Sequence, residues 1–102
     1  MKLNITIPIT NLDGTTLLDP ESKQAITLKT VLINSLLGTY PDETELTGVD
    51  KLTRYELSKT IYEANSTCDI TTDNIVLIKK LIGKAYATLV VGQVFNILEG
   101  GK

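Results

Sequence analysis

The amino-acid sequence predicts an α+β fold in which a short N-terminal β-hairpin packs on a bundle of about four helices. Every second residue from 3 to 9 is large and apolar, which is the period of a half-buried strand. From residue 27 onward, apolar residues recur at helical spacing between residues that can cap helices. The 102 residues suit one domain, 1–102, with the hairpin over 1–20 and the helical body over 27–98.

The predicted hairpin consists of a strand, a tight turn and a short return strand. Pro8 lies on the face opposite the apolar residues and has no N–H to donate, so the strand lies at a sheet edge or ends there. Residues 11–14 are typical of a turn, because Asn and Asp bond their own backbone and Gly tolerates positive φ. Residues 15–18 are expected to return as the second strand.

The first two helices are predicted from their caps. Thr27 is expected to cap a helix that ends at Leu37, with Gly38 as its C′ residue. Asp50 is expected to cap a second helix over 50–64. Apolar and aromatic residues lie on two sides of this helix. One side carries Leu52, Tyr55, Lys59 and Tyr62, and another carries Leu57 and Ile61.

The C-terminal third is predicted to hold two more helices. Thr71 is expected to cap a helix over 71–85, and Thr88 one from Leu89 to about Leu98. The run 89–91 also suits a strand, and that alternative stays open. A helix that is apolar nearly all round, as this last one is, lies in a core or is covered by a partner.

The composition excludes several chemistries. The chain has no His and only one Cys, so it lacks the usual general base and any Cys-based zinc site. No catalytic residue, metal site or cofactor is expected, and the protein is expected not to be an enzyme. Asp42, Glu43 and Glu45 fall in a loop over 39–48 that reads as exposed and solvated, which does not give two carboxyls contrasting environments. A hydrolase or transferase stays possible only if this loop folds into a cleft.

The sequence also bears on location and on partners. The mostly apolar stretch 85–98 is too short to cross a membrane, and the N-terminus does not resemble a signal peptide. We expect a cytoplasmic protein with Cys68 reduced. The net charge of −2 and the pI near 5.0 do not favour nucleic acid as a partner.

Two groups of residues stand out as candidate surfaces. One is a basic face, which is either a solvated helix face or a phosphate-binding surface: Arg54, Lys59, Lys79, Lys80 and Lys84. The other is the apolar excess of the last helix, which suits a core and a protein interface equally: Leu89, Val90, Val91, Val94, Phe95 and Leu98.

The order of segments 11–14, 27–32, 51–57, 70–80 and 90–94 resembles small uncharacterised proteins of tailed bacteriophages and prophages of Gram-negative bacteria. There is a looser likeness to tail-assembly chaperones, in which a short hairpin precedes a helical body. The resemblance implies a non-enzymatic assembly factor, adaptor or modulator of host machinery in the cytoplasm of a bacterial host cell. It carries over no functional residue.

Two hypotheses of function follow. The first is a protein–protein interaction module, an assembly chaperone or adaptor that binds itself as a homodimer or binds another protein. In this hypothesis the last helix supplies the anchors, with Phe95 and Leu98 at the centre. The alternative is a small DNA-interacting regulator that uses helices 50–64 and 71–85 as a helix-turn-helix. Against it, the connector 65–71 is longer than the usual turn of that motif.

Overall fold

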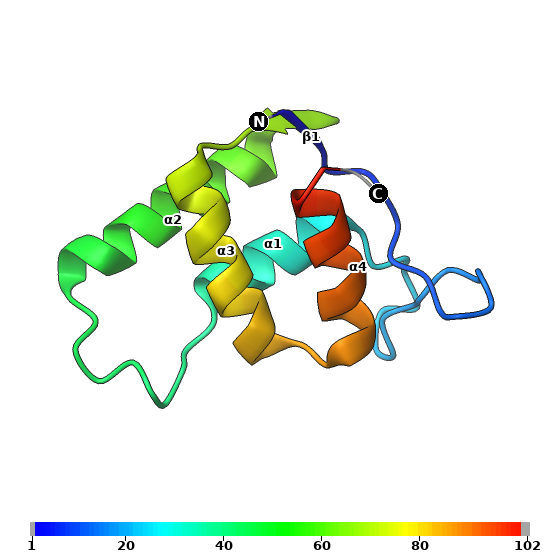
Figure 1. The fold of residues 1–102 in the computed structure, drawn as a ribbon, viewed down its shortest axis with the longest axis horizontal. Coiled ribbons are helices and arrows are strands. Elements are labelled where there is room, and N and C mark those ends of the chain that lie inside the picture. The colour runs from blue at the N-terminus through cyan, green and yellow to red at the C-terminus, as the bar shows by residue number, and fades with distance from the viewer. Residues whose placement is uncertain (1, 101–102) are drawn as a thin grey trace.

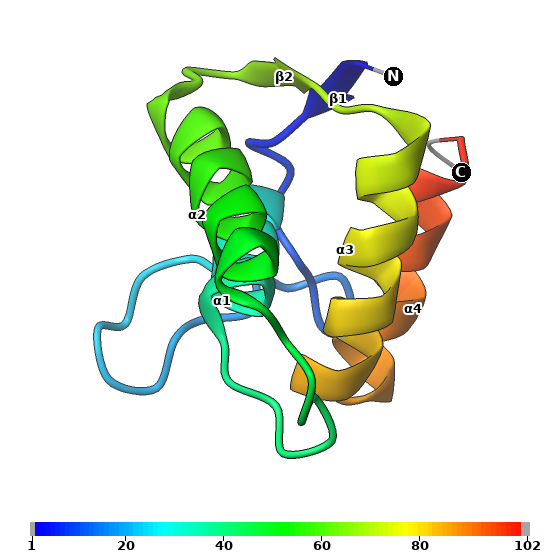
Figure 2. The ribbon, with the colours of Figure 1, turned by 90° about the vertical axis from the view of Figure 1, so that its left-hand side faces the viewer.

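The computed structural model describes residues 2–100 and confirms the α+β class (Figure 1). α1 lies in the middle of the molecule, with α2 and α3 packed on it and α4 packed on α3. In Figure 2, α2 and α3 stand side by side, with the two strands across their upper ends. The elements in chain order are β1 (Lys2–Asn4), α1 (Leu28–Leu37), α2 (Gly48–Glu63), β2 (Thr67–Asp69), α3 (Thr72–Ala85) and α4 (Thr88–Leu98).

The strand partner differs from the predicted one. β1 pairs antiparallel with β2, with Leu3 opposite Cys68, and residues 15–18 form no strand. The predicted turn is present, because the Asn11 N–H donates to the Thr15 carbonyl at 2.8 Å. Beyond β1, the chain first bonds the start of α1, where the Lys29 N–H donates to the Ile5 carbonyl at 3.0 Å. It then bonds the predicted return segment, where the Leu17 N–H donates to the Ile9 carbonyl at 2.9 Å and Thr10 forms an isolated bridge with Thr16. The alternating apolar residues of this segment therefore pack against the helices.

A glutamine side chain fixes the N-terminal segment to α4. The amide of Gln93 accepts a hydrogen bond from the Thr10 N–H at 3.0 Å and donates one to the Thr10 carbonyl at 2.7 Å. This side chain thus satisfies both backbone groups of Thr10, as a neighbouring strand would do.

Both ends of α1 are confirmed, and only the conformation expected of Gly38 is corrected. The Thr27 side chain accepts a hydrogen bond from the Thr30 N–H, as an N-cap does. Gly38 follows the last helical residue, but its φ is −68°, so it is not in the left-handed C′ conformation. The space around it explains a glycine here instead. A Cβ would lie 2.9 Å from the Tyr40 hydroxyl, which donates a hydrogen bond to the Ser35 carbonyl at 2.7 Å.

Of the N-caps predicted for the other three helices, the one for α3 is confirmed, and those for α2 and α4 are wrong. Thr71 caps α3 as predicted. α2 starts earlier than expected, because Thr47 is its N-cap and Asp50 is the third helical residue of a capping box. The last segment is a helix, so the strand alternative is wrong. It begins at Thr88, and Ala87, which has no side chain able to bond the backbone, takes the cap position.

The core lies between α1 and the other helices. α1 contributes Leu28, Val31 and Leu32, all fully buried, and α3 contributes Ile78, Leu81 and Ile82. Ile5 and Ile9 of the N-terminal segment complete it from the side. Within residues 2–100, no helix is long and apolar enough to cross a membrane.

Candidate functional site

An ion pair fastens the loop between α1 and α2 to the helices. We call residues 39–47 the acidic loop. Arg54 of α2 donates two hydrogen bonds to the Glu43 carboxylate, at 2.8 and 2.6 Å, and both side chains are less than a tenth exposed. The loop is therefore not wholly solvated, contrary to the prediction. Glu43 points inward because Arg54, in the first half of α2, binds its carboxylate, while Asp42 and Glu45 stay exposed.

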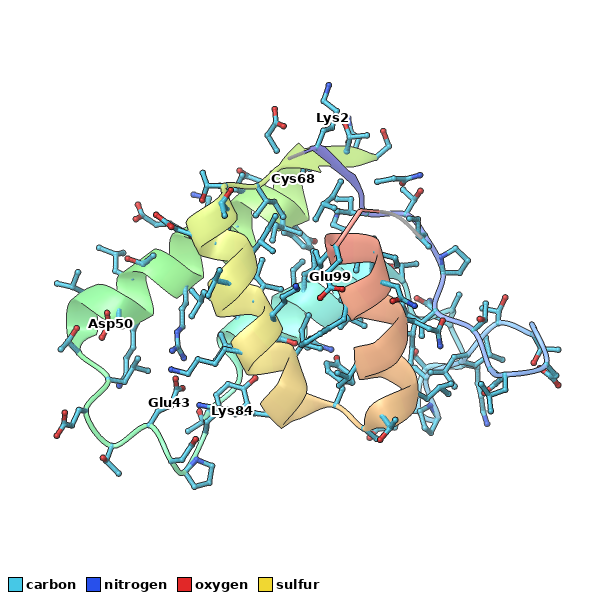
Figure 3. All side chains as sticks on the ribbon, viewed as in Figure 1. Lys2, Glu43, Asp50, Cys68, Lys84 and Glu99 are labelled. Atoms are coloured by element: carbon cyan, nitrogen blue, oxygen red, sulfur yellow. The ribbon has the colours of Figure 1, made fainter. Side chains whose placement is uncertain are left out.

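The charges around this pair lower the proton affinity of Glu43. Hydrogen bonding by Arg54 holds the pKa of Glu43 at about 2, and Lys84 of α3 lies 3.8 Å from the same carboxylate and 3.1 Å from that of Asp42. Glu43 and Lys84 lie close together at the lower end of α3 in Figure 3. Burial and the Glu43 charge raise the pKa of Tyr40. Glu43 is thus ionised throughout the physiological range.

A polar hollow of about 570 Å³ lies between the acidic loop, α2 and α3. The acidic loop therefore does border a cleft, which was the condition for enzyme chemistry. A general acid working near neutral pH needs a raised carboxyl pKa, whereas that of Glu43 is lowered. Charged residues of both signs line the hollow: Asp42, Glu43, Glu45, Asp50, Arg54, Lys80 and Lys84.

The structure does not assemble the predicted basic face into a free cationic surface. Arg54 and Lys84 pair with the acidic loop, and Lys79 pairs with Glu99 at 2.8 Å. Lys79 also lies over the Phe95 ring, 5.4 Å from its centroid. Among the described residues, only Lys59 and Lys80 of the five candidates form no ion pair. The acids that neutralise the other three are distant in sequence, which is why the sequence alone did not show them.

The predicted interface on the last helix is half core. Val90, Val94 and Leu98 are buried against the rest of the monomer, so they are not available as anchors for a partner. Their spacing of four residues turns all three toward α3 and the N-terminal segment. The other three candidates are half-buried: Leu89, Val91 and Phe95. Leu89 also lines a hollow beside Leu12, an almost fully exposed leucine of the predicted turn.

The exposed apolar side chains gather on α2 instead. We call Leu52, Tyr55, Lys59 and Tyr62 the outer face of α2, because Leu57 and Ile61 of the same helix point into the core. Leu52, Tyr55 and Tyr62 are 54%, 56% and 70% exposed. Lys29 covers part of the Tyr62 ring, with its Nζ 5.2 Å from the ring centroid. Helical spacing predicted that these residues share one side of a helix. They were not predicted as an interface, because the last helix is more apolar and was the stronger candidate.

The two flanks of this outer face differ. On one flank, Leu37, Lys51 and Tyr55 line a second hollow of about 500 Å³, which we call the Leu37 hollow. On the other flank, Val49 is 73% exposed and is followed by Glu56 and Glu63 at intervals of seven residues. One side of the outer face thus borders a hollow and carries Lys51, and the other carries the exposed Val49 and two glutamates.

Comparison of the chain with protein-family models, with curated proteins and with solved structures finds no match. Within residues 2–100, no three His, Cys, Asp or Glu side chains are grouped so that they could hold a metal ion. Cys68 is buried, and burial together with Asp69 raises the pKa of its thiol.

Proposed function

We propose that the protein is a non-enzymatic protein–protein interaction module, of the assembly-factor or adaptor type, that self-associates through the outer face of α2. The observation that supports this function is the second apolar stripe of α2. A surface helix normally has one apolar stripe, which faces the core. α2 has that stripe at Leu57 and Ile61, and it carries another, solvent-exposed one at Leu52, Tyr55 and Tyr62.

The composition of this face suits an interface. Tyr side chains combine a large apolar ring with a hydroxyl that tolerates water, and they are enriched at the energetic centres of protein interfaces. Two of them lie seven residues apart on the outer face of α2, with Leu52 beside the first. Clustered exposed apolar residues of this kind mark interaction sites, whereas single ones do not.

The DNA-binding alternative gains no comparable support, because three of its five cations are paired and its connector contains β2.

Sedimentation analysis of two leucine variants tests the proposal. We expect the wild-type chain to be dimeric at tens of micromolar, and Leu52→Ser to be monomeric. Leu12→Ser is the matched control, because Leu12 is even more exposed but lies in the N-terminal segment, on the opposite side of the molecule in Figure 1. A monomeric wild type, or equal effects of the two substitutions, would overturn the proposal. Circular dichroism of each variant confirms that its helices are intact.

A further inference from the structure

We infer that the self-associating unit is a parallel pair, in which α2 packs in register against α2 of a second copy around a two-fold axis. This inference rests on the proposed function and adds the orientation of the partner. The spacing of the outer face supports it, because Leu52, Tyr55, Lys59 and Tyr62 follow each other by three, four and three residues. That is the a and d pattern of a two-heptad coiled-coil seam.

The charges beside the seam select the parallel orientation. With Leu52 and Lys59 at a, Lys51 occupies position g, and Glu56 and Glu63 occupy position e. In a parallel pair, a g residue meets the e residue five positions later on the other helix, so Lys51 of each copy meets Glu56 of the other. In an antiparallel pair, g meets g and e meets e, so Lys51 at one end of the seam meets no glutamate, and Glu56 near the middle meets Glu56 of the other copy. Only the parallel pair joins opposite charges, and it does so twice.

The shape of the two flanks gives a second, independent argument. Val49 precedes Glu56 by one heptad, so it also occupies an e position, and it is 73% exposed. The Leu37 hollow lies on the g flank, next to Lys51 and Tyr55. A parallel pair brings the e flank of one copy to the g flank of the other. Val49 of each copy then faces the Leu37 hollow of its partner, whereas an antiparallel pair places Val49 among the acidic residues.

Lys59 fits this arrangement as a polar a residue that fixes the register of the two helices. As the second a residue, it places two ammonium groups on either side of the two-fold axis, where they repel each other. A single polar residue at an a position lowers the stability of a coiled coil but fixes its register and keeps it two-stranded. Lys59 is exposed in the monomer and forms no ion pair with any described residue.

Charge exchange at Lys51 and Glu56 tests the orientation by sedimentation equilibrium. In a parallel pair, Lys51→Glu and Glu56→Lys each turn two attractive pairs into repulsive ones, and we expect each to raise the dimer dissociation constant about tenfold. The double variant restores both pairs with reversed sign and is expected to return within about threefold of wild type. Both side chains are exposed, so we expect each variant to keep the fold, which circular dichroism checks.

A second double variant controls for net charge. Lys51→Glu combined with Glu21→Lys has the same net charge, but Glu21 lies in the N-terminal segment, away from α2. This control is expected to stay as weak as Lys51→Glu alone, and restoration by it would overturn the inference. An antiparallel pair gives a different result: each single variant associates like wild type, and an equimolar mixture of the two associates more tightly. If Leu52→Ser abolishes the dimer but the charge exchanges have no effect, the result supports the proposed self-association and contradicts the parallel orientation. A monomeric wild type would contradict both the self-association and the orientation.

Discussion

Arg54 and Glu43 form a two-pronged ion pair that joins the acidic loop to α2 with both side chains nearly buried. Because Arg54 is fixed in the first half of α2, the pair determines where the loop lies. The loop in turn forms one wall of the polar hollow and part of the Leu37 hollow. The pair therefore shapes both hollows that adjoin α2.

Glu43→Gln is expected to lower the free energy of unfolding by about 2 kcal/mol, because Arg54 keeps a nearly buried charge without its counter-ion. The loss is smaller than for a pair deep in a core, since water from the adjoining hollow reaches the guanidinium. Urea denaturation measures it. Glu45→Gln, an exposed carboxyl of the same loop, is the control and should change stability by less than about 0.5 kcal/mol.

The same pair predicts how stability depends on acid. The pKa of Glu43 is about 2 in the folded chain, below its ordinary value of 4.5, so the unfolded chain binds the proton more readily. The stability contributed by Glu43 is therefore complete above pH 4.5 and is lost as the pH falls from 4.5 to about 2. The difference between wild type and Glu43→Gln should shrink across this window in urea titrations at a series of pH values. A constant difference would show that the charge of Glu43 contributes nothing.

Two glycine-to-alanine substitutions should have opposite effects. At Gly38, the added methyl group would lie 2.9 Å from the Tyr40 hydroxyl and 3.3 Å from the Asn34 carbonyl, so we expect a loss of about 1–2 kcal/mol. At Gly83, inside α3, the methyl group meets no atom within 4 Å, and alanine should gain about 0.5–1 kcal/mol from its better helix propensity. Thermal unfolding followed by circular dichroism measures both. A destabilising Gly83→Ala would contradict the packing described for α3.

The local parts of the fold were predictable from the sequence. The caps at Thr27 and Thr71 were correct, because a cap depends on a hydrogen bond between residues three positions apart. The partner of β1 was not predictable, because three residues of alternating pattern pair equally well with any short extended segment. The turn at residues 11–14 was predicted correctly, but its two arms are joined by an isolated bridge and two backbone hydrogen bonds and form no regular strands.

The candidate site was predictable only in part. Helical spacing placed Leu52, Tyr55 and Tyr62 on one side of α2, but exposure depends on which side α1 and α3 cover, and this is a tertiary property. For the same reason, the apolar excess of α4 did not distinguish a core from an interface, and half of it is core. The burial of Glu43 depends on Arg54, a residue in another element, so a loop rich in acids gave no sign of it.

The hydrogen bonds between Gln93 and Thr10 have a consequence for how the chain folds during synthesis. The two residues are 83 positions apart in the sequence. Leu3 likewise pairs with Cys68, which is synthesised much later. Leu3 and Thr10 therefore leave the ribosome long before these partners exist, whereas Ile5 and Ile9 find their backbone partners within residues 17–29. The N-terminal segment can therefore complete its contacts only after α4 has been synthesised.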